Sequence, residues 1–182
     1  MKDLRKSVML SLLLVPVTVL IDPDNAYGLP KIMMTTDNGS TFVEVTIDKG
    51  TVVDNTFTID APQQVKFDIN FMHPGAFDPI THVNYEFHIT DESGNMLVHK
   101  TKLHIHEGMD TQSITFSKMG SFTLTINVIG TGLSQPYDTT NSGTVSAVIA
   151  VVPEFPLGVM AIMAALAGIG VVVTRFKNTL KL

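Results

Sequence analysis

The chain has 182 residues, enough for one domain of ordinary size with additional segments. It contains no cysteine, which excludes disulfides, thiolate zinc sites, thiol catalysis and a blue-copper centre, since the last needs a Cys ligand beside two His. Residues 29–152 hold six basic residues against 13 acidic ones, a net charge of −7. Such an acidic region is a poor partner for nucleic acid or anionic lipid.

The first 28 residues have the organisation of a secretory signal peptide. Three basic residues precede an apolar run over 8–21, and at 14 residues this run is shorter than the ~20 that a membrane-spanning helix needs. Small residues follow, and cleavage after Gly28 or after Ala26 fits them. We therefore predict a signal peptide over 1–28, with an uncleaved anchor as the alternative.

Between residues 29 and 152 apolar and polar residues alternate with the period of two that is typical of half-buried strands. The alternation is strictest in four segments: 41–47, 64–71, 81–90 and 121–128. Weaker strands are predicted near 51–59, 96–106, 112–117 and 144–152. Turn-forming residues separate these segments. Seven or eight short strands without an amphipathic helix predict an all-β fold, namely a single immunoglobulin-like antiparallel β-sandwich.

The C-terminus has the composition of a membrane anchor. Residues 157–174 contain no charge over 18 positions, just long enough for a transmembrane helix. The basic tail 175–182 that follows predicts a cytoplasmic end. A buried core helix is the alternative. Together with the signal peptide, this pattern predicts a single-pass protein of the cell membrane whose β-sandwich lies on the extracytoplasmic side.

The junction at 153–156 contains a recognisable motif. Pro153, Glu154, Phe155 and Pro156 precede the apolar span and the basic end, and this tail resembles the PEF-type C-terminal sorting tails of archaeal surface proteins, which are particularly common in ammonia-oxidising archaea. The resemblance implies either replacement of the tail by a lipid anchor through an archaeosortase or its retention as a transmembrane helix.

A second, looser resemblance covers roughly residues 35–157. The segments "HVNYEFHITDESGNMLVHKTKLHIHEG" and "SITFSKMGSFTLTINVIG" are similar to the sandwich domain that those archaeal surface proteins often carry. This resemblance implies an extracytoplasmic domain whose ligand is unknown, and it does not point to any particular activity.

All six histidines fall between positions 73 and 106. His104 and His106 share one face of a predicted strand, ~7 Å apart along the chain, so both can bind one ion. A third ligand would come from the strand predicted over 81–90. Imidazole is the commonest metal ligand, and His with Met suits copper outside the cell. The full candidate set for a metal site is His73, His82, His88, His104, His106 and Met109.

Two other interpretations of the histidines stay open. Alternating His, Asn, Glu and Lys on the solvent face of a strand needs no ligand, since cross-strand His–Glu pairs can stabilise a sheet. A surface rich in imidazole can also respond to pH. His99 has the opposite parity to His104 and is expected to face elsewhere unless a bulge intervenes.

The sequence contains none of the common catalytic motifs. A nucleophile elbow, the zincin pattern HExxH, a phosphate loop and a dinucleotide fingerprint are all missing from it. We therefore expect that the chain is not an enzyme. Asn38-Gly39-Ser40 matches the acceptor pattern for N-glycosylation, which makes Asn38 a candidate modification site.

These features predict a membrane-anchored cell-envelope protein that presents a β-sandwich binding or structural module outside the cell and needs no cofactor. The alternative is an extracytoplasmic copper-binding or copper-trafficking protein that uses the surface histidines. A third possibility is an accessory subunit of a membrane complex, whose helix would pack through Gly158, Gly168 and Gly170. The expected partners are the membrane and other envelope proteins, without nucleic acid.

Overall fold

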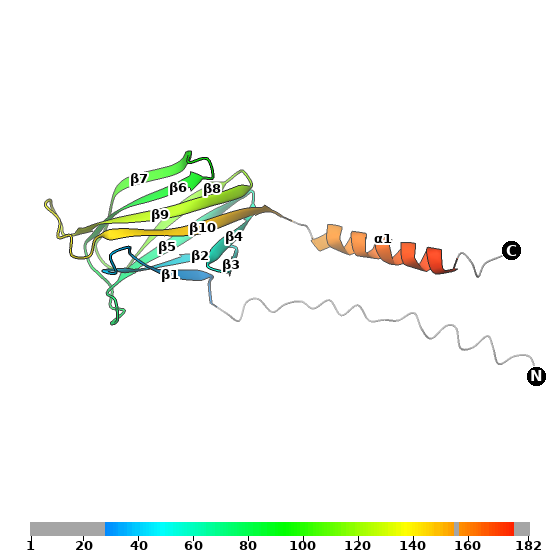
Figure 1. The fold of residues 1–182 in the computed structure, drawn as a ribbon, viewed down its shortest axis with the longest axis horizontal. Helices are drawn as coiled ribbons and strands as arrows, with labels where there is room; N and C mark the ends of the chain where they lie inside the picture. The colour runs from blue at the N-terminus through cyan, green and yellow to red at the C-terminus, as the bar shows by residue number, and fades with distance from the viewer. Residues whose placement is uncertain (1–27, 155–156, 177–182) are drawn as a thin grey trace, which may run out of the picture.

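The computed structural model describes residues 28–154 and 157–176, which are drawn in colour in Figure 1. Apart from Gly28, the predicted signal peptide lies outside the described residues, as do Phe155, Pro156 and positions 177–182. The elements are β1 (Lys31–Thr35), β2 (Phe42–Ile47), β3 (Thr51–Val53), β4 (Thr56–Ala61), β5 (Gln63–Met72), β6 (Val83–Asp91), β7 (Met96–Ile105), β8 (Met109–Phe116), β9 (Gly120–Thr131), β10 (Gly143–Pro153) and α1 (Leu157–Phe176).

The strands form two packed sheets (Figure 1). One sheet has the strand order β1-β2-β5-β8, and the other has the order β3-β4-β10-β9-β6-β7. The predicted all-β fold is therefore confirmed. The prediction of a purely antiparallel arrangement is wrong at one pair, because β4 and β10 run parallel, with Ala61 opposite Pro153. A parallel pair needs a long connection, and strands β5 to β9 supply it.

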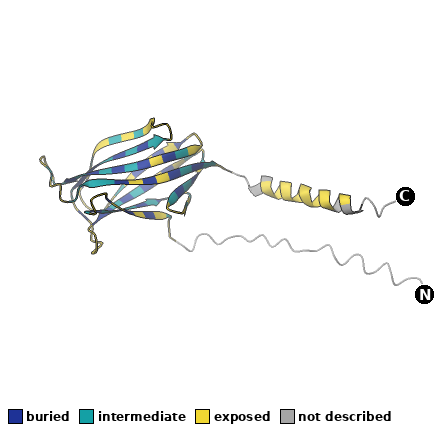
Figure 2. Ribbon diagram, viewed as in Figure 1, coloured by how far each residue is buried: buried dark blue, intermediate teal, exposed yellow. Residues whose placement is uncertain are grey.

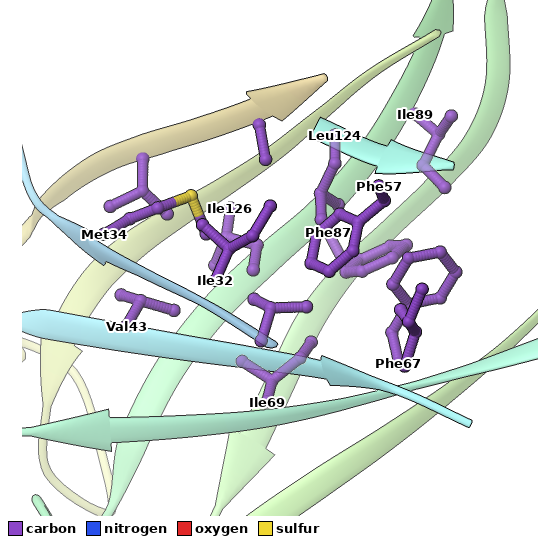
Figure 3. Packing of buried hydrophobic residues seen from close by; sticks show 14 of the residues in the cluster. Ile32, Met34, Val43, Phe57, Phe67, Ile69, Phe87, Ile89, Leu124 and Ile126 are labelled. Atoms are coloured by element: carbon purple, nitrogen blue, oxygen red, sulfur yellow. The ribbon is translucent and has the colours of Figure 1, made fainter. Parts of the chain in front are cut away.

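The core lies between the sheets, where the apolar faces of both meet (Figures 2 and 3). Phe67 of β5 has no exposed surface, and it is surrounded by rings from both sheets. Its ring centroid lies 6.2 Å from that of Phe57, 6.0 Å from that of Phe87 and 6.3 Å from that of Phe116. Since Phe57 and Phe87 belong to the six-stranded sheet, Phe67 joins the two layers of the sandwich.

Most of the predicted strands are present with small shifts of their ends. The segment 51–59, predicted as one strand, instead forms the hairpin of β3 and β4. Its two turn residues, Asp54 and Asn55, have φ angles of 47° and 60°, as expected for a tight hairpin turn. Strand β1 was not predicted from the sequence. Its buried residues are Ile32 and Met34.

A chain of polar side chains joins the sheets beside the core. The Tyr85 hydroxyl of β6 donates to Asp110 Oδ2 of β8, and Gln112 Nε2 donates to Tyr85 Oη at 3.1 Å and to Asp110 Oδ2 at 2.8 Å. Lys100 Nζ of β7 donates to Gln112 Oε1 at 2.8 Å. Burial, together with the hydrogen bond to the Asp110 carboxylate, raises the pKa of Tyr85 far above its usual range. Tyr85 therefore remains a protonated donor that links β6 to β8.

Helix α1 contradicts the predicted location of the protein. In the part of the chain that the structure describes, no helix is both long enough and apolar enough to cross a membrane. The prediction of a single-pass membrane location, with a transmembrane helix over 157–174, is thus not supported.

Candidate functional site

A bulge in β7 determines which histidines share a face. The register between β6 and β7 shifts by one residue in the middle of the pair, and an extra residue turns the side chains beyond it to the other face. His99 lies opposite His88, and His104 lies opposite Asn84. Both histidines of β7 therefore lie on the outer face of the six-stranded sheet. Because His99 and His104 have opposite parity in the sequence, we expected them to share a face only if a bulge intervened. Strand β7 contains such a bulge.

Three histidines meet at one end of this face. The ring centroid of His82 lies 5.7 Å from that of His104, with the planes 27° apart. It lies 4.3 Å from that of His106, with the planes 75° apart. His104 and His106 are exposed, whereas His82 is half-buried. We name these three residues the histidine cluster.

Asn84 fixes the hydrogen bonding of the cluster. It is only 6% exposed, and its Nδ2 donates to the backbone oxygens of His82 at 3.2 Å and Gly132 at 2.8 Å. Its Oδ1, which can only accept, lies 2.9 Å from Nδ1 of His104. The proton of neutral His104 is thereby assigned to Nδ1, so Nε2 retains a free lone pair. Metal-binding histidines have their second nitrogen held in this way.

His82 has an unusual backbone and an unusual side-chain environment. Its φ angle of 54° lies in the left-handed region, which costs a non-glycine residue about 1–3 kcal/mol. The backbone holds this conformation through bonds from the His82 N–H to His106 O at 3.0 Å and from the Gly132 N–H to His82 O at 2.9 Å. Within the described residues, the buried Nδ1 of His82 has no hydrogen-bond partner.

A pair of histidines separate from the histidine cluster lies further along the outer face of the six-stranded sheet. The ring centroids of His88 and His99 are 4.4 Å apart, with the planes 31° apart. His88 Nε2 lies 3.4 Å from Glu86 Oε2, which also accepts from Asn127 Nδ2 at 3.4 Å. His88 thus belongs to this pair and does not join the histidine cluster.

The two remaining candidate ligands, His73 and Met109, come from segments other than those that carry the histidine cluster. His73 lies in the exposed loop after β5, and the exposed Met109 opens β8. His73 takes no part in the ring contacts found among histidines in the described ranges. No group of three or more His, Cys, Asp or Glu in residues 28–154 and 157–176 is arranged to hold a metal ion. The three rings therefore touch one another but do not form a preassembled metal centre.

Asn38 is engaged in the turn between β1 and β2. Its Nδ2 donates to Ser142 O at 2.8 Å, and its Oδ1 accepts from the Thr36 hydroxyl at 2.9 Å and from the Ser40 N–H at 3.1 Å. The nitrogen to which a glycan would be attached thus holds this turn against the loop before β10.

The predicted sorting motif is described only in its first half. Pro153 is the last residue of β10 and pairs with Ala61, and the exposed Glu154 follows it. Phe155 and Pro156 lie outside the described residues. A role of these four residues in sorting stays a prediction.

No family model matches the chain, and no curated protein matches it significantly. A function for the chain is therefore inferred from its own residues.

Proposed function

We propose that the chain is a non-catalytic β-sandwich module of the cell envelope with a binding or structural role, and that its binding surface is the outer face of β6 and β7. The observation that carries this proposal is the gathering of five histidine rings along that one face. The buried core beneath the sheet supports it further, because side chains on a rigid element are held in fixed relative positions. The similarity of 153–156 to archaeal sorting tails supports the envelope assignment.

The same proposal includes the type of sandwich. Two sheets over a shared core, linked by a chain that passes repeatedly from one sheet to the other, favour an immunoglobulin-like arrangement. In the variable domains of this fold, the loops that bind ligands lie at one end of the sandwich. The histidine cluster lies at such an end, where β6 begins and β7 finishes.

Labelling of intact cells tests the envelope assignment. Antibodies raised against the sandwich are expected to label intact cells of the organism that produces the chain, because the module would lie outside the cytoplasm. A cytoplasmic protein detected in the same cells serves as the control for lysis. Labelling that requires permeabilised cells would contradict the proposal.

A second candidate function, the binding of copper, is favoured by one observation. His82 lies beside both His104 and His106, so three imidazoles from two segments of the chain meet, and the Nε2 lone pair of His104 is free. Imidazole nitrogen is a good ligand for copper. Because His104 and His106 are exposed, their rings can turn toward a shared ion without disturbing the core.

Titration of the full chain with Cu(II), and with Cu(I) under reductant, tests this candidate. We expect binding of one ion that is weakened at least tenfold in the double variant His104→Ala/His106→Ala. The matched control is His88→Ala/His99→Ala, which removes two rings from the same face outside the histidine cluster and is expected to leave the affinity unchanged. If the two double variants lose copper affinity equally, or if the wild-type chain binds no copper, copper binding by the histidine cluster is ruled out.

A further inference from the structure

A hollow opens on the outer face of the six-stranded sheet beside His104. Its volume is about 580 Å³, which falls in the range of small-molecule sites. Strands β6 and β7 form its floor, and the loop 131–138 between β9 and β10 forms its wall; this loop projects beyond the sheets in Figure 1. The lining includes Asn84, Lys102, His104, Ile129, Leu133 and Tyr137.

The wall of the hollow is held in place at its base. Thr131 and Asp138 exchange two backbone hydrogen bonds, each 2.8 Å long. The Gly132 N–H donates to His82 O at 2.9 Å, and Gly132 O accepts from Asn84 Nδ2 at 2.8 Å. These four bonds fasten both ends of the loop to each other and one end to β6. A ligand that entered the hollow would therefore meet a wall that needs little ordering, and this lowers the entropic cost of binding.

Two of the five non-glycine residues with a positive φ angle in the described part of the chain lie beside this hollow. Lys102, with a φ angle of 58°, and His82, with a φ angle of 54°, both adopt the left-handed conformation. Strained non-glycine residues persist only where the surrounding structure holds them, and they are concentrated at ligand sites. In β7 the strain coincides with the bulge, which places Lys102 in the lining of the hollow.

The chemistry of the lining is cationic on one side and apolar on the other. Lys102 supplies an exposed ammonium group, and on the opposite side Leu133, 75% exposed, and Tyr137 supply apolar surface. The only carboxylate of the loop, on Asp138, accepts from the Thr140 N–H at 2.9 Å and from its hydroxyl at 2.7 Å, and these bonds hold it in its own turn. An exposed apolar residue beside a cation fits a ligand with an acidic group and a ring.

We propose that the hollow binds a small organic acid whose carboxylate adjoins a ring, with the carboxylate on Lys102 and the ring against Leu133 and Tyr137. The inference rests on the binding role proposed for the face of β6 and β7, and it names the ligand class. A sugar acid and an aromatic acid share this chemistry.

Calorimetric titration of the full chain with D-glucuronate and with benzoate tests the proposal and distinguishes the two sources. We expect one of the acids to bind, and its uncharged counterpart, D-glucose or benzyl alcohol, to bind at least tenfold more weakly. Lys102→Asn is expected to lower the affinity about tenfold, since a charged hydrogen bond is lost. Asparagine tolerates the left-handed backbone, so this variant retains the fold. Lys49→Asn, at an exposed turn, removes the same charge elsewhere and is the matched control.

A second variant and a second readout make the outcome decisive. Tyr137→Leu keeps an apolar side chain but removes the ring, and it is expected to weaken the bound acid as well. In the wild-type chain, the backbone amide NMR signals around Lys102 and Leu133 are expected to shift with the acid. Failure of both acids to bind, or binding that survives Lys102→Asn and Tyr137→Leu, would overturn the proposal. Such a failure leaves the labelling of intact cells unaffected, so the envelope assignment is tested separately.

Discussion

Replacing Phe67 with alanine is expected to lower the free energy of unfolding by about 3–5 kcal/mol. Phe67 is completely buried, and its ring packs on three others at 6.0–6.3 Å. Because these neighbours come from both sheets, neither sheet can collapse into the space without losing its own packing, and a cavity would remain. Chemical denaturation of the two chains, followed by circular dichroism, measures the difference.

The matched control for this change is Phe77→Ala. Phe77 is 52% exposed and stacks on Phe42 alone among aromatic residues in the described part of the chain, with the centroids 5.5 Å apart. An aromatic pair of this kind contributes about 0.5–1.5 kcal/mol beyond the area that it buries. If both substitutions lower the free energy of unfolding by the same amount, the ring contacts of Phe67 do not hold the two sheets together.

The alternation of apolar and polar residues in the sequence was sufficient to predict those strands in which every residue that faces the core is apolar. Strand β1 was missed because Met33, 45% exposed, is apolar on the outer side and hides the alternation of Ile32 and Met34. The start of β8 was missed for the opposite reason. The missed residues are Met109–Thr111, and the one of them that faces the core is the polar Asp110, half-buried, whose carboxylate accepts hydrogen bonds from Tyr85 and Gln112.

The candidate site was predictable only within one strand. The period of two placed His104 and His106 on one face, but whether His82 or His88 would meet them depends on the pairing register. The bulge in β7 sets that register and pairs His88 with His99. Contacts between residues distant in the chain are not encoded in any local pattern. The hollow beside the loop 131–138 could not be predicted for the same reason, because its lining comes from segments that are far apart in the chain.

Asn84 is the residue of the site that the sequence did not reveal, since an outward-facing asparagine in a strand is usually solvated. Its amide joins β6 to Gly132 and to His104. Asn84→Ala is expected to lower the free energy of unfolding by about 1–3 kcal/mol, because buried acceptors lose their donor. The variant also frees Nδ1 of His104, so the preference of the neutral ring for the Nδ1–H tautomer is expected to disappear. Denaturation measures the first effect, and the ¹⁵N shifts of the ring measure the second.

Asn127→Ala provides the comparison that separates these effects from a general loss of a polar side chain. Asn127 lies on the same outer face, but its side-chain bonds to Glu86 and Thr144 are long, at 3.4 Å and 3.3 Å, so its loss is expected to cost less than that of Asn84. It should also leave the His104 ring signals unchanged. If the ring signals of His104 report Nε2–H in the wild-type chain, or do not change in Asn84→Ala, then Asn84 does not orient His104. The copper candidate would then lose its support from a free lone pair on His104 Nε2.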